Sequence, residues 1–351
     1  MAENITQEFL QLVKIVEGMQ QKVNRLEQAN QVLIRSNSQL IEWGKDIAAE
    51  FEDYKRNAYF ELQDSRVKED GFYYPLILSG EKAVDKIVLE KKSLARFGDG
   101  EFAAIAGRVR HKFQTEIDEV LGGRLRQVLQ SDDEDLLVGI ADNYGNLEKY
   151  SEQAKREIRR YLNPEVRKEH LRLLNPKKNY YDAYVTRPYV MYADNKTEAP
   201  KKRFENLKRI WNDRACVFVE GSKTALGVGN DLFGNVKSIK RILAPEKNAF
   251  HQYNRLLEKC QEQEKDILFL LALGPTATVL AYDLCKAGYQ AVDVGHVDLE
   301  YEWYLKGKGC RTEVVGKYNN EMPGGEVLEE IRDPEYQRQI IADYSHEEEK
   351  L

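Results

Sequence analysis

The sequence predicts an α/β protein in which a Rossmann-like, mostly parallel sheet follows a long N-terminal coiled-coil helix. Residues 214–295 alternate short apolar runs with amphipathic helical patterns, the order that builds βαβ units. Residues 1–60 repeat an apolar side chain at alternating intervals of four and three, and no proline interrupts them. We therefore expect a coiled-coil dimerisation helix over residues 1–65, a globular domain over 66–330 and a charged tail over 331–351.

Composition excludes several classes of protein. The chain has 351 residues, 42% of them hydrophobic, which is enough for one large or two modest domains. A formal net charge of -6, with both signs spread along the chain, is unlike the basic field of a general nucleic-acid binder. The N-terminus lacks a secretory pattern, and the longest apolar run, Ile267 to Leu273, is too short to span a bilayer. Four widely spaced cysteines without a CxxC pair are typical of reduced, buried thiols, so we expect a cytoplasmic protein.

The N-terminal repeat predicts a parallel homodimer. Asn30 and Asn37 fall at successive a positions, where paired asparagines favour an in-register two-stranded coil at a cost in stability. Gly44 at the next a position adds to this cost, so one alternative is that the C-terminal part packs on the globular domain. Another alternative is a single amphipathic helix on the domain surface. The seam consists of Ile5, Phe9, Leu12, Val16, Met19, Val23, Leu26, Asn30, Leu33, Asn37, Leu40, Gly44, Ile47, Phe51 and Tyr54.

The globular region reads as strands and helices in alternation. Short runs of β-branched and apolar residues predict the strands, and amphipathic patterns predict the helices. The tail after residue 326 is charged, with room for a short helix. The expected strands are 94–97, 136–140, 215–219, 238–243, 266–273 and 290–294, and the expected helices are 80–90, much of 103–180, 249–263 and 276–287.

Three stretches at strand ends carry candidate chemistry. Asp99 and Glu101 follow a strand and are separated by glycine, a pattern suited to a hard divalent cation, although Asp-Gly is also an ordinary turn. The turns Glu220–Asp231 and Gly274–Thr278 place glycines and hydroxyls where they can meet phosphate, but neither is a Walker loop or a dinucleotide fingerprint. His296, Asp298, Glu300 and Glu302 close the last strand. If extended, that stretch has its polar groups on one face, and if helical it keeps Asp298 and Glu302 together. The alternative is a solvated helix start with Asp298 as its N-cap.

Three further segments have weaker signals. Asp142 to Gly145 follows an expected strand and is a possible second part of the site. Residues 150–179 are rich in lysine and arginine, which indicates either a solvated face or a surface for an acceptor or anionic lipid. The aromatics of 182–192 either fill the core or stack on a sugar or base.

Four short segments of the sequence, taken together, resemble the bacterial GT-D glycosyltransferases. This family was long labelled a domain of unknown function and is known from a glucosyltransferase of adhesin glycosylation. The pieces are Arg96-Phe-Gly-Asp-Gly-Glu-Phe, Glu220-Gly-x-x-Thr-x-Leu-Gly-Val-Gly-Asn-Asp-Leu-Phe, Gly295-His-Val-Asp-Leu-Glu-Tyr-Glu-Trp and Gly316-Lys-Tyr-Asn-Asn-Glu. The resemblance covers about residues 75–325 and leaves the N-terminal helix unexplained.

The resemblance implies a metal-dependent hexosyltransferase of GT-D fold that uses a nucleotide sugar, with UDP as the expected nucleotide, and a glycan or glycoprotein acceptor. It implies that Asp99 and Glu101 hold Mn²⁺ or Mg²⁺. Among the carboxylates of Asp298, Glu300 and Glu302 we expect Glu302, then Asp298, to act as base, and His296 to be either a metal ligand or a group that holds the donor. The alternatives are a non-catalytic nucleotide-binding scaffold and a metal-dependent phosphohydrolase. The expected donor-binding residues are Arg96, Gly98, Glu220, Thr224, Gly227, Gly229, Asn230 and Asp231.

Overall fold

The computed structural model describes residues 2–66, 74–109, 113–319, 325 and 331–346. The chain forms two units, residues 1–62 and residues 63–351, which we describe separately. The end of the Gly316–Glu321 piece and residues 347–351 of the predicted charged tail lie outside the described ranges. Within those ranges no helix is long and apolar enough to cross a membrane.

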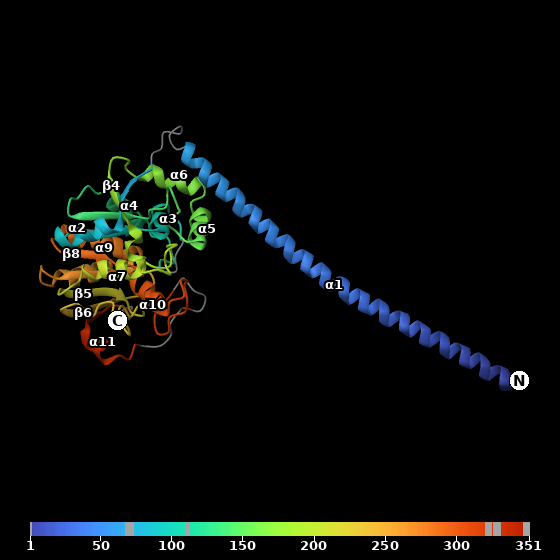
Figure 1. The fold of residues 1–351 in the computed structure, drawn as a ribbon. Helices are drawn as coiled ribbons and strands as arrows, with labels where there is room; N and C mark the ends of the chain where they lie inside the picture. Colours follow the sequence, from blue (N-terminus) through green and yellow to red (C-terminus); the bar gives the residue numbers. More distant parts are fainter. Residues whose placement is uncertain (1, 67–73, 110–112, 320–324, 326–330, 347–351) are drawn as a thin grey trace. The chain divides into compact units, whose positions relative to one another are not determined.

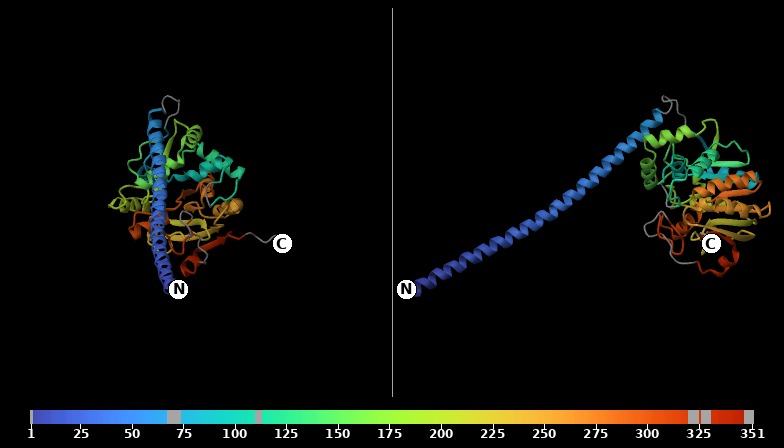
Figure 2. Two further views of the ribbon diagram at one scale, coloured as in Figure 1. Left: turned by 90° about the vertical axis from the view of Figure 1, so that its right-hand side faces the viewer. Right: turned by 180° about the vertical axis from the view of Figure 1, so that it is seen from behind.

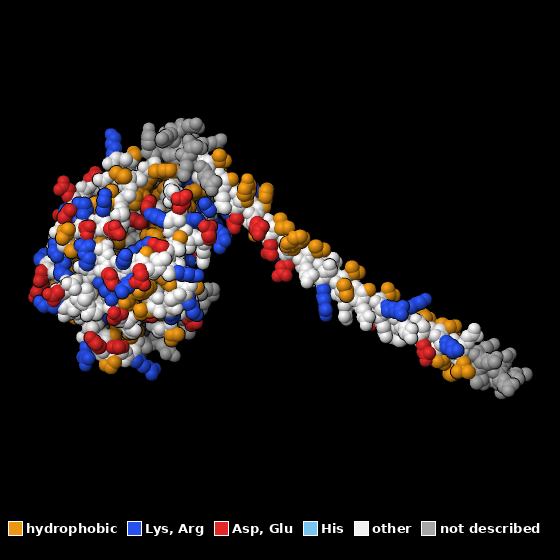
Figure 3. All heavy atoms as spheres, in the orientation of Figure 1, with side chains coloured by type: hydrophobic (Ala, Val, Ile, Leu, Met, Phe, Trp, Pro, Cys, Tyr) orange, Lys and Arg blue, Asp and Glu red, His pale blue; other side chains and the backbone are white. Residues whose placement is uncertain are grey.

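The first unit consists of one helix, α1, which runs without interruption from Ala2 to Arg66, so the last four residues of the helix belong to the second unit (Figures 1 and 2). The expected long helix is therefore confirmed. Its apolar seam is exposed along the chain: Leu26, Leu33 and Leu40 are 70%, 61% and 58% accessible. Figure 3 shows apolar side chains recurring along the described part of the rod, interrupted by charged ones. The pairing of two such helices stays a prediction.

The second unit is built on one nine-stranded sheet of order β1-β4-β3-β2-β8-β7-β5-β6-β9. Every pairing between these strands is parallel, which confirms the predicted fold class. The central strands are apolar and buried on both faces, as parallel strands covered by helices must be. The strands are β1 Leu76–Leu78, β2 Ser93–Phe97, β3 Leu136–Ile140, β4 Asn179–Asp182, β5 Ala215–Gly221, β6 Ser238–Ala244, β7 Leu268–Ala272, β8 Gln290–Asp293 and β9 Ile340–Asp343.

Helices cover both faces of this sheet (Figure 1). On one face α9 packs on β2 and β8, with α4 and α8 beside it. Elsewhere on the sheet α2 packs on β4 and on α7. Right-handed crossovers place α2 and α7 on the face opposite α9. The bounds are α2 Gly80–Leu89, α3 Asp99–Ile105, α4 Glu119–Leu129, α5 Glu152–Tyr161, α6 Pro164–Leu173, η1 Ala183–Thr186, α7 Ala199–Lys208, η2 Ala249–Gln252, α8 Tyr253–Gln261, α9 Pro275–Lys286, α10 Val297–Lys306 and α11 Pro334–Gln339.

The structure differs from the sequence expectations in a few places. It adds three short strands, β1, β4 and β9, which are not among the strands expected from the sequence. Three cysteines are buried as expected, but Cys310 is exposed. The glycine stretch after β2 is not a loop, because α3 begins directly at Asp99.

Candidate active site

A cavity of about 490 Å³ lies at the carboxyl ends of β2, β3, β5, β7 and β8. The strand order reverses here: the chain leaves β2 toward β3 on one side and leaves the neighbouring β8 toward β9 on the other. In open α/β sheets this switch point is where ligands bind, because the loops on either side diverge and leave a crevice. The predicted 142–145 stretch contributes Asn143 and Tyr144 to the wall.

The Asp99–Glu101 pair lies at the start of α3 and lines this cavity. The Glu101 carboxylate turns back and accepts a hydrogen bond from the Gly98 amide at 2.7 Å. This bond satisfies a free N–H at the helix start and fixes the carboxylate, and both acidic groups gain from the positive end of the helix. Among the described residues no three His, Cys, Asp or Glu side chains gather as a metal site. The two carboxylates nevertheless present the oxygen ligands that Mg²⁺ and Mn²⁺ accept together with phosphate oxygens.

Arg96 reaches from β2 to the end of β8 and ties the two central strands together. Its Nη2 donates to the Asp293 carboxylate and its Nε to the Asp293 carbonyl, each at 2.9 Å. Burial raises the pKa of Asp293, and the guanidinium opposes that shift. Gly295 has a φ of 49°, and a Cβ there would lie 1.9 Å from Arg96 Nη2. Glycine is therefore required at this position both for its backbone conformation and for the close approach of the arginine.

The His296–Trp303 stretch is helical, which settles the alternative left open by the sequence. Asp298 is buried in the first turn of α10, so the stretch is not a solvated helix start, and the N-cap is His296 rather than Asp298. His296 lines the cavity, and its Nδ1 lies 3.1 Å from Arg187 Nη2. Because arginine can only donate, Nδ1 accepts and the ring carries its proton on Nε2.

Glu300 is not among the described residues that line this cavity. Its carboxylate is fully buried and accepts the backbone N–H groups of Tyr189 and Val190 at 3.1 and 3.0 Å. Arg187 Nη1 lies 3.7 Å from the same carboxylate. Glu300 therefore holds the segment that carries Arg187, and the structure does not bring it into the cavity lining.

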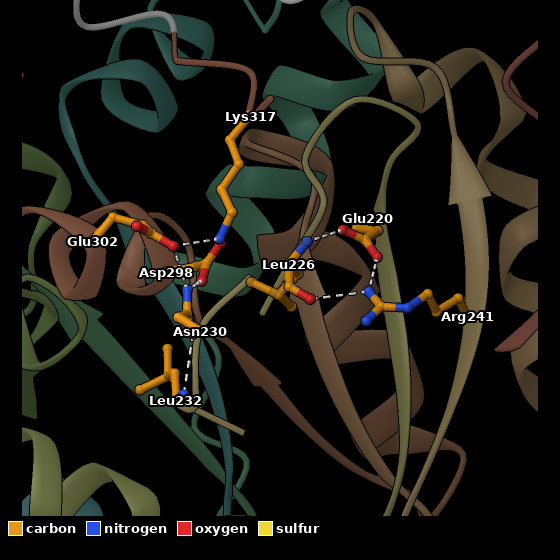
Figure 4. Close-up of polar contacts among 8 residues, drawn as sticks. All are labelled: Glu220, Leu226, Asn230, Leu232, Arg241, Asp298, Glu302 and Lys317. Carbon is orange, nitrogen blue, oxygen red and sulfur yellow. Dashed lines mark hydrogen bonds and ion pairs between the residues drawn. The ribbon is translucent and has the colours of Figure 1, made fainter. Parts of the chain in front are cut away.

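The buried Asp298 and Lys317 share a polar cluster with the half-buried Asn230 and Glu302 (Figure 4). The Asn230 amide donates to both carboxylates at 2.8 and 2.6 Å, and Lys317 Nζ does so at 2.6 and 3.0 Å. Burial raises the pKa of Asp298, and the Lys317 cation opposes the shift. Among the described residues Asp298 lines the cavity but Glu302 does not, so the structure places the first-choice base outside the wall.

Glu220 anchors the loop after β5 (Figure 4). Its fully buried carboxylate accepts the Leu226 N–H at 2.7 Å and pairs with Arg241, whose Nη1 also donates to the Leu226 carbonyl at 3.0 Å. Burial raises the pKa of Glu220, with Arg241 opposing. Two oxygens and one guanidinium thus fix the loop, and Thr224 and Leu226 from this loop line the cavity.

The rest of the predicted donor-binding loop lies outside the described lining of the cavity. Gly227 and Gly229 adopt φ values of 74° and 80°, and a Cβ on Gly227 would lie 2.6 Å from the Phe233 ring. Asp231 is exposed, and the hydrogen bond from the Tyr301 hydroxyl at 2.7 Å lowers its pKa. These residues shape the loop, whereas Arg96, Gly98 and Thr224 face the cavity.

Sequence reasoning missed the basic part of the wall. Arg160, Arg187 and Arg311 line the cavity together with Arg96. Arg160 belongs to the basic stretch 150–179, so that stretch does supply part of the site. Arg187 lies in the aromatic stretch 182–192, where nothing in the local sequence distinguishes it, and no local pattern marks Arg311.

The fold and the site define the class: an α/β enzyme domain with an acidic and basic cavity at the switch point of a parallel sheet. Residues 94–322 match the family described as Glycosyltransferase GT-D fold. The chain belongs to this family of glycosyltransferases, and the resemblance seen in the sequence is confirmed.

Curated relatives and solved structures agree with this assignment. The chain is 35% identical over 272 residues to a "Probable glycosyl transferase Gly" of Streptococcus gordonii and 36% identical over 268 residues to "Glycosyltransferase GlyD" of Streptococcus pneumoniae. The matches cover 77% and 75% of this chain but only 39% and 32% of those relatives, so the chain spans well under half of their length. A structure described as a new glycosyltransferase (DUF1792) from Streptococcus sanguinis matches with 34% identity and a TM-score of 0.71, over 77% of this chain and all of that one. Another, described as having a distinct glycosyltransferase fold, matches with 34% identity and a TM-score of 0.70, over 77% of this chain and 96% of that one.

Proposed function

We propose that this domain transfers a hexose from a UDP-sugar to a glycan or glycoprotein acceptor of surface polysaccharide or glycoprotein synthesis, with Mn²⁺ or Mg²⁺ at Asp99 and Glu101. One observation carries the proposal: two carboxylates at a helix start face a cavity that four arginines also line, at the switch point of a GT-D domain. This combination suits a ligand that is both a polyanion and a partner for a divalent cation.

Asp99 and Glu101 are the residues that would hold the cation. When bound, the metal ion would neutralise the charge that develops on the leaving diphosphate. The Gly98 N–H donates a hydrogen bond to one carboxylate oxygen of Glu101, Oε2. Glu101 therefore supplies a carboxylate whose direction the helix start fixes, and Asp99 supplies a second carboxylate two residues earlier in the same helix.

The arginines would bind the diphosphate around that ion. Arg187 is the best placed, because it contacts His296 and lies near Glu300, so its guanidinium is held at the wall. The Nε2–H of His296 adds a neutral donor beside it. Charge-assisted hydrogen bonds of this kind strengthen as negative charge builds on the leaving group.

We assign the role of base to Asp298 ahead of Glu302. Asp298 lines the cavity, whereas Glu302 lies outside the described lining. Its raised pKa brings this carboxyl nearer to the operating pH, where a general base is most effective. Glu302 and Lys317 would then position Asp298 rather than touch the substrate.

The experiment is a transfer assay with labelled UDP-hexoses, Mn²⁺ and candidate glycan acceptors. Asp99→Asn should lower kcat by about 10²-fold or more, while Asp135→Asn, an exposed carboxylate at the start of β3, should not. Titration of Mn²⁺ with UDP, followed by electron paramagnetic resonance, tests the metal site without turnover.

Three outcomes would contradict the proposal. Release of the sugar into water without transfer to any acceptor would indicate a phosphohydrolase. Nucleotide binding without turnover would indicate a scaffold. Unchanged Mn²⁺ binding and full activity in Asp99→Asn and Glu101→Gln would remove the metal assignment.

A further inference from the structure

The long helix α1 has an apolar face that is exposed to solvent over the residues of its unit whose side chains are described. The a and d side chains from Phe9 to Tyr54 are exposed, and the largest of them are more than half accessible. At about 1.5 Å per residue, 65 residues make a rod of ~98 Å. A stripe of this length in water is far larger than the apolar patches that monomeric proteins leave exposed.

The polar residues within the seam select one alignment of two chains. Asn30 and Asn37 occupy a positions, and in a parallel, in-register pair each meets its own copy and can exchange hydrogen bonds with it. An antiparallel pair places a against d. The antiparallel alignment that matches the charges of Lys22 and Glu50 sets Asn30 against Leu40 and Asn37 against Leu33, which buries amides against leucines.

The charges that flank the seam select the same alignment. Lys22 and Glu50 fall at g positions, and Glu27 and Lys55 fall at the e positions five residues later. In parallel coils a g residue meets the e residue of the next heptad on the partner helix. Lys22 then faces Glu27 of the second copy and Glu50 faces Lys55, so both sites carry opposite charges. In the antiparallel alignment above Glu27 instead faces Ile41.

We propose that α1 pairs with a second copy of this chain as a parallel, in-register two-stranded coiled coil, aligned by the asparagine layers and by the Lys22–Glu27 and Glu50–Lys55 charge pairs. The inference does not depend on the reaction that the second unit catalyses. Its consequence is a particle that carries two catalytic domains, so an acceptor with several sites would be held at a raised effective concentration.

Paired charge reversals test the alignment in the full chain. The acidic variant carries Lys22→Glu and Lys55→Glu, and the basic variant carries Glu27→Lys and Glu50→Lys. Each alone should raise the dissociation constant of its homodimer by ~100-fold, because four attractive contacts become repulsive. Mixed one to one, the two should recover a dimer, because every g–e contact between them is attractive again. Light scattering gives the mass, and differently tagged chains report the heterodimer.

The matched control puts the same charge changes on the outer face, with Lys14→Glu and Arg35→Glu in one chain and Glu42→Lys and Asp46→Lys in the other. These variants should stay homodimeric. Lys55 also contacts Glu52 of its own helix at 2.7 Å, so circular dichroism must show that helicity is retained. A monomeric or higher-order wild-type chain at micromolar concentration would overturn the proposal, and so would an acidic and basic mixture that fails to pair while both remain helical.

Discussion

Gly295→Ala is expected to destabilise the second unit well beyond the strain of its backbone conformation. The added Cβ would lie 1.9 Å from Arg96 Nη2, and Arg96 can move aside only by giving up its two hydrogen bonds to Asp293. Asp293 is buried, so it would keep a carboxylate without its counter-ion.

The magnitude follows from two terms. An L-residue with positive φ costs about 1–2 kcal/mol, and breaking a buried ion pair costs about 3–5 kcal/mol. Gly307→Ala supplies the matched control, because Gly307 has a φ of 66° and nothing lies within 4 Å of the position of its Cβ. Gly295→Ala should therefore lower the free energy of unfolding by about 3 kcal/mol more than Gly307→Ala, which corresponds to a further fall in Tm of roughly 6–12 °C.

The assay should follow the second unit and not α1. Tryptophan fluorescence during urea unfolding serves this purpose, because Trp211 and Trp303 are buried whereas Trp43 on α1 is exposed. Equal losses for the two glycine variants would refute the reasoning, since Arg96 would then move at no cost. A double-mutant cycle with Arg96→Met checks the cause: once the arginine is absent, Gly295→Ala should cost no more than Gly307→Ala.

Three further predictions concern buried charges. Lys317→Met should destabilise the fold by about 3–5 kcal/mol, because Asp298 and Glu302 lose the cation between them. If urea unfolding shows that the free energy of unfolding falls by less than about 1 kcal/mol, the ion cluster does not stabilise the fold. Glu300→Gln keeps an oxygen that can accept the two backbone N–H groups, so kcat should stay within about threefold of the wild-type value. A loss of about 10²-fold in kcat would indicate that Glu300 takes part in catalysis. Burial raises the pKa of Asp182 from 3.8 to about 6, so the folded state binds this proton more tightly and stability falls as pH rises from about 4 to 6. Asp182→Asn should remove up to ~3 kcal/mol of that fall, and parallel slopes for wild type and variant in urea unfolding across this pH window would contradict it.

The sequence located the central strands because they are buried on both faces and read as continuous apolar runs, as in Leu268–Ala272. It missed the short strands nearer the edges. Asn179–Asp182 has two tyrosines between polar ends, and its pairing with β1 and β3 is what makes it a strand. The edge strand Ile340–Asp343 is only partly buried, and its apolar run of three residues is too short to distinguish it from a loop or the end of a helix.

The position of the candidate site was also predictable, because parallel strands end at one edge of a sheet and the polar groups follow those ends. The direction of each side chain was not. The helix sends Asp298 toward Lys317, 19 residues away, and Glu300 toward the amides of Tyr189 and Val190, more than a hundred residues away. Tertiary packing determines such partners, and the local sequence spacing does not predict them.

The β2–β8 junction has a consequence for the order in which the protein is made. Arg96 and Asp293 are 197 residues apart, so the two halves of the cavity cannot meet until most of the chain has left the ribosome. Pairing of strands so distant in sequence requires the closure of a long loop and is slow. The N-terminal helix emerges long before. If α1 pairs with a second copy as we propose, two nascent chains on one message would associate while both domains are still incomplete. Ribosome-bound chains arrested near residue 200 should then already copurify as pairs, yet lack the protease resistance of the finished sheet.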